Sequence, residues 1–508
     1  MKYLMEIWKM KTIHLILMMT AILLSIAFSD VSAQTTGGPA LVVHYQFSDM
    51  VASGKNVYVT YQQNIGNGEG SSVFFRKSTD GGSSFDKIIP LGNDSRSANP
   101  MVATSGNNVY VTWMENWGGH GNSYVMFERS TDGGNTFSMP VRLSNNDGEA
   151  GPQKIIASGN SVYILILYSL QGNTAERVSL LSSHDNGTTF GMPTTILEDT
   201  QTRGSVDMVV SEDGNLVYVS GQDSGKCPID KMDCQYNIFL EKSTDGGTSF
   251  EDPITVKTTN QSIAYPIMTT SDGNVYLSWS ETMGDNRILF FAKSNDKGTT
   301  VSKPVVFSQE IGESSFPQLV ANGKNVFLVW DYSNESIILN EKYHNNIVTD
   351  SPVSGFFFAK SIDGGNTFSS PINLSGIAGT SYWSNVASSG NNVFVSWGTK
   401  FNDTQEVFIK KSTDDGITFG NAIKLTDSKQ NYFQMEAISS GNYVYVAIDS
   451  AYPGDDLFLV SSDDDGNTFG NLVNLNHGII VPEFPLAIQV LLISSVLLMV
   501  LYRIKFRK

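Results

Sequence analysis

The sequence predicts an all-β fold, a β-propeller built from four-stranded antiparallel blades. Two short motifs alternate along the chain in eight copies each, and hardly any stretch between the two ends is long and helix-periodic. Four strands in every repeat are typical of a propeller blade. Eight repeats predict eight blades, and seven are the alternative if a terminal repeat is incomplete. We expect an N-terminal signal segment before the propeller and a C-terminal transmembrane helix after it.

The first motif, which we call the box, has the pattern S-x-D-x-G-x-[ST]-F. Its short polar residues and glycine are typical of a turn rather than a strand or a helix. The fifth copy ends in Val301 in place of phenylalanine. The eight copies begin at Ser78, Ser130, Ser183, Ser243, Ser294, Ser361, Ser412 and Ser462.

The second motif is a glycine-asparagine turn followed by an apolar strand such as "VYVTW". The second repeat shows the whole unit, with strands expected at residues 100–105, 109–113 and 124–130 and a weak fourth strand at 140–144. Alternating β-branched and aromatic residues between such turns indicate hairpins. The box is therefore expected between the third and fourth strands. Residues 40–47 precede the first repeat, and we expect them to complete or cover the last blade.

The first 33 residues are typical of a secretory signal peptide. Three lysines precede an apolar run over residues 12–28, and a small-x-small site follows at 31–33. A retained N-terminal anchor is the alternative.

The C-terminal residues 481–508 predict a membrane anchor. Residues 486–502 carry no formal charge over 17 positions, and four basic residues follow. This length spans a bilayer core, and the basic tail places the C-terminus in the cytoplasm. Residues 34–480 would then form the propeller at the cell surface. The "PEF" before the span resembles archaeal surface-protein sorting tails, which would imply cleavage and a different anchor.

The charge and the cysteines bear on partners and location. The net charge of −17 argues against nucleic acid as a partner. Cys227 and Cys234 are the only cysteines, and outside the cell they are expected to form a disulfide, since a zinc site would need further ligands. N-x-[ST] sequons of a glycoprotein begin at Asn93, Asn186, Asn260, Asn334, Asn373 and Asn402.

The box resembles the Asp-box, or BNR repeat, of sialidase-like β-propellers, and the resemblance covers residues 40 to 476. A motif that recurs once per blade is expected to be structural, with each aspartate accepting backbone hydrogen bonds inside the turn. No cofactor is expected, and calcium held by these aspartates is a minor alternative. The box aspartates are Asp80, Asp132, Asp185, Asp245, Asp296, Asp363, Asp414 and Asp464.

The resemblance also implies that a ligand would bind on the face opposite the boxes. Loops between the second and third strands and the blade-entry segments lie on that face. Aromatic residues flanked by polar side chains suit sugars, and loops on a rigid scaffold commonly hold binding sites. The candidate ligand-binding residues are Glu115, Trp117, His120, Glu281, Arg287, Asp331, Tyr382 and Trp383.

The resemblance does not supply a catalytic residue. Active sialidases need three arginines, a Tyr–Glu pair and an acid/base aspartate, and their first arginine lies in an R-I-P motif that the folded part lacks. Arg76, Arg129 and the lysines before the boxes are expected on strand surfaces. The leading hypothesis is a membrane-anchored binding or scaffold module for glycans or surface proteins. The alternative is a sialidase-like glycoside hydrolase.

Overall fold

The computed structural model describes residues 43–476 except 66–69, 93–95, 117–121, 146–147, 171–175, 201–205, 225–234, 285, 309–312, 334–353, 377–379, 402–403, 427–430 and 451–455. The chain divides into two units, Val43–Asn476 and the two terminal segments. The expected signal peptide, sorting tail and membrane span lie outside the described residues, as do Cys227 and Cys234. Within the described part, no helix has the length and apolar character to cross a membrane.

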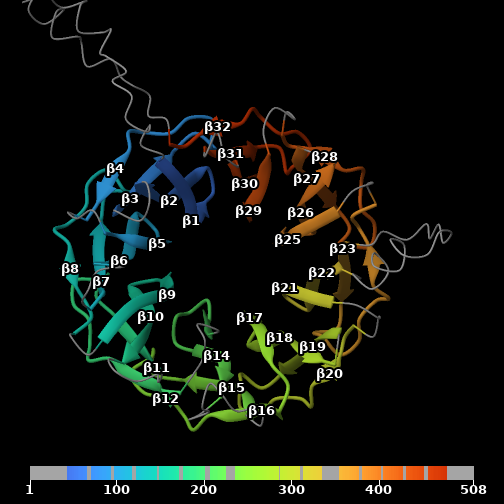
Figure 1. Ribbon diagram of the computed structural model, residues 1–508, viewed down its shortest axis with the longest axis horizontal. Helices are drawn as coiled ribbons and strands as arrows, with labels where there is room; N and C mark the ends of the chain where they lie inside the picture. The colour runs from blue at the N-terminus through green and yellow to red at the C-terminus, as the bar shows by residue number, and fades with distance from the viewer. Residues whose placement is uncertain are drawn as a thin grey trace, which may run out of the picture. The chain divides into compact units, whose positions relative to one another are not determined.

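The described residues form eight four-stranded antiparallel blades arranged in a ring, as predicted (Figure 1). The innermost strands are β1 (Val43–Ser53), β5 (Ala98–Ser105), β9 (Gly148–Ser158), β13 (Val206–Val210), β17 (Ile263–Ser271), β21 (Glu313–Asn322), β25 (Thr380–Ser389) and β29 (Tyr432–Ser440). The second strands are β2 (Asn56–Ile65), β6 (Asn108–Glu115), β10 (Ser161–Leu170), β14 (Val217–Asp223), β18 (Asn274–Met283), β22 (Asn325–Ser333), β26 (Asn392–Phe401) and β30 (Tyr443–Ser450).

The outer half of each blade contains its box. The third strands, each ending on the serine of a box, are β3 (Gly70–Ser78), β7 (Tyr124–Ser130), β11 (Glu176–Ser183), β15 (Tyr236–Ser243), β19 (Asn286–Ser294), β23 (Ser354–Ser361), β27 (Thr404–Ser412) and β31 (Leu457–Ser462). The outermost strands are β4 (Ile89–Leu91), β8 (Val141–Arg142), β12 (Thr194–Thr200), β16 (Ile254–Thr259), β20 (Val305–Val306), β24 (Ile372–Asn373), β28 (Ile423–Lys424) and β32 (Val473–Asn474).

Within the described residues, the ring closes without exchange of a strand between the first and last blades. The strands of every blade follow one another in sequence, from β1-β2-β3-β4 to β29-β30-β31-β32. The expectation that residues 40–47 complete the last blade is therefore wrong for the described part, because Val43–Ser53 is the innermost strand of the first blade. The two blades meet through a shared apolar core that includes Met50 and Val57 on one side and Tyr445 and Leu457 on the other.

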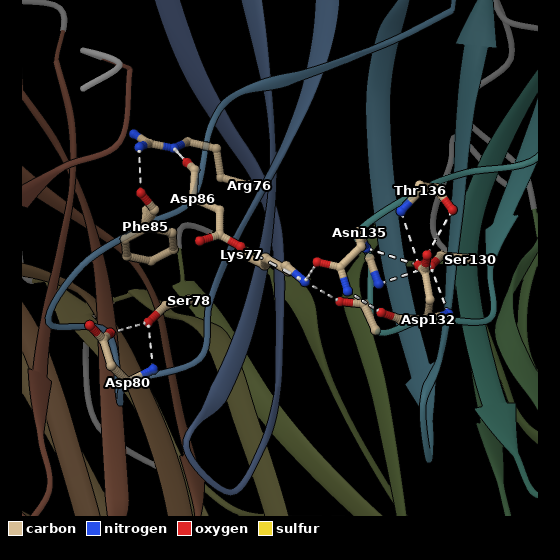
Figure 2. A network of polar contacts seen from close by, with 12 residues as sticks. Arg76, Lys77, Ser78, Asp80, Phe85, Asp86, Ser130, Asp132, Asn135 and Thr136 are labelled. Atoms are coloured by element: carbon tan, nitrogen blue, oxygen red, sulfur yellow. Dashed lines mark hydrogen bonds and ion pairs between the residues drawn. The ribbon is translucent and has the colours of Figure 1, made fainter. Parts of the chain in front are cut away.

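Hydrogen bonds within the box explain its turn. In the second blade, Asp132 Oδ1 accepts from the Ser130 hydroxyl at 2.7 Å and the Thr136 N–H at 2.9 Å, and Oδ2 accepts from the Thr136 hydroxyl at 2.7 Å (Figure 2). The Gly133 N–H donates to Asn107 O at 2.9 Å, which ties the box to the turn between the first two strands. Gly133 and Gly134 have φ of 68° and 76°, a conformation that glycine adopts without strain.

The boxes also join neighbouring blades. The phenylalanine that ends a box packs edge-on against the third strand of the preceding blade, as Phe137 does on Phe75 with ring centroids 4.9 Å apart. The basic residue before a box reaches the box of the next blade, where Lys77 Nζ donates to Gly133 O at 2.8 Å and Asn135 Oδ1 at 2.7 Å (Figure 2). The expectation that these basic residues lie on the surface is wrong for four of them, which are buried: Arg76, Lys77, Lys242 and Lys293.

Candidate functional site

The innermost strands place one equivalent residue from each blade around the axis. Seven of these strands contain a β-bulge at a similar depth, and the residue after the bulge pairs with an equivalent position of the second strand, as Asp49 pairs with Thr60 and Met101 with Thr112. β13 reaches the same position without a bulge. We call the eight residues the axial ring. They are Asp49, Met101, Lys154, Asp207, Ile267, Gln318, Asn385 and Glu436.

A cavity of about 540 Å³ lies against one half of the axial ring. It is lined by the innermost strands of the first four blades and includes the ring residues Asp49, Met101, Lys154 and Asp207. Four charged residues in a ring of eight give the axis a polar character that the surrounding blade cores lack.

The ring aspartates bind the backbones of adjacent blades. Asp49 accepts from its neighbour Met50 N–H at 2.9 Å and, across the blade boundary, from Val102 N–H of β5 at 2.8 Å. Asp207 likewise accepts from Met268 N–H of β17 at 2.8 Å, and its other oxygen lies 2.5 Å from Lys154 Nζ. These side chains therefore link the innermost strands in pairs around the axis.

Two ring carboxyl groups are hard to ionise. Desolvation by the surrounding strands raises the pKa of Asp49 to about 6, although backbone hydrogen bonds and Lys154 oppose the shift. Burial, and then the negative charge of Asp49, raise the pKa of Glu436 well above its usual value. The two groups occupy equivalent positions on β1 and β29, the neighbouring innermost strands of the first and last blades.

Exposed aromatic side chains lie two residues before the axial ring, toward the face opposite the boxes. Phe316 on β21 and Trp383 on β25 are 40% and 44% exposed. Both have a positive φ, 51° and 54°, which is unusual for an aromatic residue. The Trp383 ring also packs on Phe433 of β29, with centroids 5.0 Å apart.

Asp331 holds the backbone of this aromatic segment. Its two oxygens accept the N–H groups of Trp383 at 2.7 Å and Ser384 at 3.1 Å, and one also accepts the Ser384 hydroxyl. Burial raises the pKa of Asp331 to about 6, against the lowering effect of these hydrogen bonds. Gln62 holds Asn99, which has a φ of 49°, in the corresponding way in the second blade.

The structure brings only part of the predicted site together. Asp331 on β22 is in contact with Trp383 on β25, and Tyr382 precedes Trp383 on that strand. Glu115 lies in the second blade and accepts from the Trp113 indole N–H at 2.6 Å and from the Ser97 hydroxyl. Glu281 in the fifth blade is 1% exposed.

The remaining predicted residues lie apart from Trp383 or outside the described part. Glu281 accepts from the Trp279 indole N–H and pairs with Lys257, both at 2.8 Å. Glu115 and Glu281 thus occupy one repeated position that orients a buried tryptophan. Arg287 lies on β19, where its backbone pairs with Glu313. Trp117 and His120 lie outside the described residues.

Sequence reasoning missed the charged members of the axial ring. The available signal was a polar residue at one repeated position, five to seven residues before the glycine of the glycine-asparagine turn, where other repeats have Met101 or Ile267. Among the described residues, no group of three or more His, Cys, Asp or Glu side chains converges as a metal site requires.

Comparison with known proteins finds solved structures that are similar to the chain at low sequence identity. No protein-family model and no curated protein matches it in sequence. A Hadza microbial sialidase is 15% identical over 70% of this chain and 76% of its own, with a TM-score of 0.34. A polysaccharide lyase acting on ulvan is 11% identical over 84% and 93%, with a TM-score of 0.45.

A third similar structure is the β-propeller domain of the trilobed protease from Pyrococcus furiosus, which is described as having an open velcro topology. It is 9% identical over 75% of this chain and 96% of that domain, with a TM-score of 0.43. At these identities the similarity concerns the fold alone.

Proposed function

We propose that the protein is a glycan-binding propeller of the cell surface whose ligand stacks on Trp383, on the face opposite the boxes. The supporting observation is the conformation of this residue. An aromatic side chain at positive φ costs on the order of 1–3 kcal/mol, and such conformations cluster at functional sites. Here the cost is met by Asp331, which binds two consecutive N–H groups of the strained segment.

The surroundings of Trp383 suit a sugar. Its ring is 44% exposed beside Phe433, so it presents an apolar surface to a pyranose ring. Gln318 and Asn385 of the axial ring follow the aromatic positions by two residues on β21 and β25, and their amides can exchange hydrogen bonds with hydroxyl groups. In this proposal residues 34–480 lie outside the cell, anchored by the C-terminal helix.

Glycoside hydrolysis is the second candidate, and one observation favours it. Asp49 and Glu436 are neighbouring carboxyl groups with raised pKa values, and a glycosidase needs one protonated and one ionised carboxyl group. Against it, Asp49 already accepts backbone N–H groups through both oxygens. We therefore place binding first.

A glycan array probed with the full chain in detergent tests the proposal. We expect Trp383→Ala to weaken binding of the selected sugar by at least tenfold. Ile362→Ala is the control, because Ile362 is 65% exposed but lies in the sixth box. Equal binding by both variants, or no bound glycan, would overturn the proposal. Release of shorter sugars, lost in Asp49→Asn, would favour the hydrolase.

A further inference from the structure

One boundary between blades differs from the other seven. Each of the seven is crossed by the chain as it passes from a fourth strand to the next first strand, but no described segment connects β32 to β1. This boundary, which we call the closing seam, depends on noncovalent contacts. Arg76 Nη1 donates to Leu475 O at 2.7 Å, Gly54 N–H donates to the Ser440 hydroxyl at 2.8 Å, and the Tyr445 hydroxyl donates to Gly54 O at 2.9 Å.

Asp49 and Glu436 lie at the axial end of the closing seam. Asp49 belongs to β1 and Glu436 to β29, and they hold equivalent places in the axial ring. The Met50 N–H that lies 2.9 Å from Asp49 Oδ1 is also a hydrogen-bond donor to Glu436, so the two carboxyl groups share one donor at the seam. Among the described residues, Lys154 is the basic group whose charge acts on both, and it is already paired with Asp207.

Other titratable groups near the seam do not offset these charges. β1 packs against β2, β5, β29, β30 and β31. Those strands contribute the phenols of Tyr58, Tyr61, Tyr432, Tyr443 and Tyr445 and the carboxyl group of Asp449, and no lysine or arginine. β29 also packs against β25, β26 and β27, which contribute Tyr382, Lys400, Glu406, Lys410 and Lys411. Lys400 is exposed, Lys410 donates to Leu374 O, Lys411 donates to Asn467 Oδ1, and Glu406 pairs with Lys424. Phenols stay neutral well above neutral pH.

We propose that Asp49 and Glu436 form a pH-sensitive latch that shares one proton across the closing seam, and that loss of this proton loosens the seam before the rest of the ring. With one group protonated, the pair carries a single negative charge that the Asp49 hydrogen bonds to Met50 and Val102 can stabilise. With both ionised, like charges repel between two partly buried groups. This inference does not depend on glycan binding.

The direction of the pH effect follows from linkage. The pKa of Asp49 is raised from 3.8 to about 6, and that of Glu436 is raised above 4.5. A carboxyl group whose pKa is raised by folding gives stability that is fully present below its unfolded value and is lost as pH rises through its folded value. The seam is therefore expected to be tight near pH 4 and to weaken as pH rises through 6 and above.

Hydrogen exchange of the full chain tests the latch without any substitution. After correction for the intrinsic pH dependence of exchange, peptides from β1 and β29 should lose at least tenfold in protection between pH 5 and pH 9. Peptides from β17, whose Met268 N–H is bound by Asp207, should change much less. Unchanged protection of β1 and β29, or an equal loss at every boundary, would overturn the proposal.

The variant Glu436→Gln adds a second readout because it keeps the side-chain shape and cannot ionise. It should keep β1 and β29 protected at pH 9. Glu406→Gln is the matched control, since Glu406 on β27 is buried and paired with Lys424 at 2.7 Å. A pH dependence in Glu436→Gln as steep as in the wild type would contradict the latch. If that variant fails to fold, the wild-type profile still decides.

Discussion

The aspartate of each box shows how much one side chain can organise. Asp132 is exposed, yet the pKa of its carboxyl group is held well below the usual range by the Ser130 hydroxyl, the Thr136 N–H and the Thr136 hydroxyl. The same three contacts recur at Asp464, whose pKa is lowered to about 2. These carboxyl groups therefore stay ionised in mild acid near pH 4, where an ordinary aspartate is about half protonated.

Replacing Asp132 by alanine should lower the melting temperature at pH 7, because four donors lose their acceptor. A lowered pKa gives stability that is present above about pH 4 and is lost only as pH falls through the folded value. The difference between variant and wild type should thus shrink in strong acid. The melting temperature of the exposed control Glu149→Ala should match that of the wild type at each pH. If the difference in melting temperature between Asp132→Ala and the wild type stays the same at every pH, the prediction is wrong.

Two buried glutamates at a repeated position have raised pKa values, in contrast to the lowered pKa values of the box aspartates. Glu128 and Glu241 stand two residues before a box, where other blades have Arg76 and Lys410, and they are 7% and 4% exposed. Burial raises their pKa values to about 7 and about 8. They are neutral in mild acid and are forced to ionise inside the protein as pH rises.

Stability should consequently fall between pH 5 and pH 9, since the folded pKa values lie above the usual 4.5. Glu241→Gln should make the fall in melting temperature shallower. Calorimetry across this range measures the slope, and the exposed Glu212→Gln serves as the control. If the slope in Glu241→Gln equals that of the wild type, Glu241 does not ionise in the predicted pH range.

At the scale of the element, each blade is a sheet with both faces covered. Alternation puts Arg76 on one face of β3 and Lys77 on the other, and each reaches a different neighbour, the last blade and the second blade respectively. A basic residue at such a position extends its apolar stem through the interface and donates hydrogen bonds beyond it. The third strand therefore contributes contacts to two blades besides its own.

Replacing Lys77 by methionine keeps the stem and removes two charge-assisted hydrogen bonds. We expect a loss of about 1–3 kcal/mol in the free energy of unfolding. Lys303→Met, at an exposed position, should change it little. Denaturant unfolding compares the two variants, and equal stability would show that Lys77 contributes only its stem.

The sequence was sufficient to predict where the strands lie, but not which of their side chains are buried between blades. Repeats with internal turns predict four strands and a box in each unit, and this much needs only local chemistry. Alternation along a strand shows that Lys77 points to the opposite side of the sheet from its neighbours in sequence. It does not show that another blade covers that side, and Lys77 was therefore expected on a surface. Asp49 and Glu436 were missed for a related reason, since strands distant in sequence meet only when the ring closes.

On the scale of the whole molecule, stability depends on the closing seam. Arg76 is 2% exposed and donates to Leu475 O, Phe85 O and Asp86 O. Lys410 occupies the equivalent position in the seventh blade and donates to Leu374 O at 3.0 Å, across a boundary that the chain itself crosses. Arg76 and Lys410 therefore allow a comparison between the closing seam, which is held by noncovalent contacts, and a boundary that the chain itself crosses.

Arg76→Met should lower the melting temperature more than Lys410→Met, because its boundary has no covalent link to keep the blades together. Limited proteolysis should release fragments of the first or last blade from Arg76→Met first. If the two variants lose the same stability and yield the same fragments, the closing seam is no weaker than its neighbours.

The absence of strand exchange has a consequence for how the protein is made. A propeller that shares a strand between its ends must wait for the last residues before its first sheet is complete. Among the described residues, the first sheet consists of strands between Val43 and Leu91, and the ribosome has made all four of them when less than a fifth of the chain is complete. Each later blade adds one finished sheet of about fifty residues, and a single docking event remains at the end of synthesis.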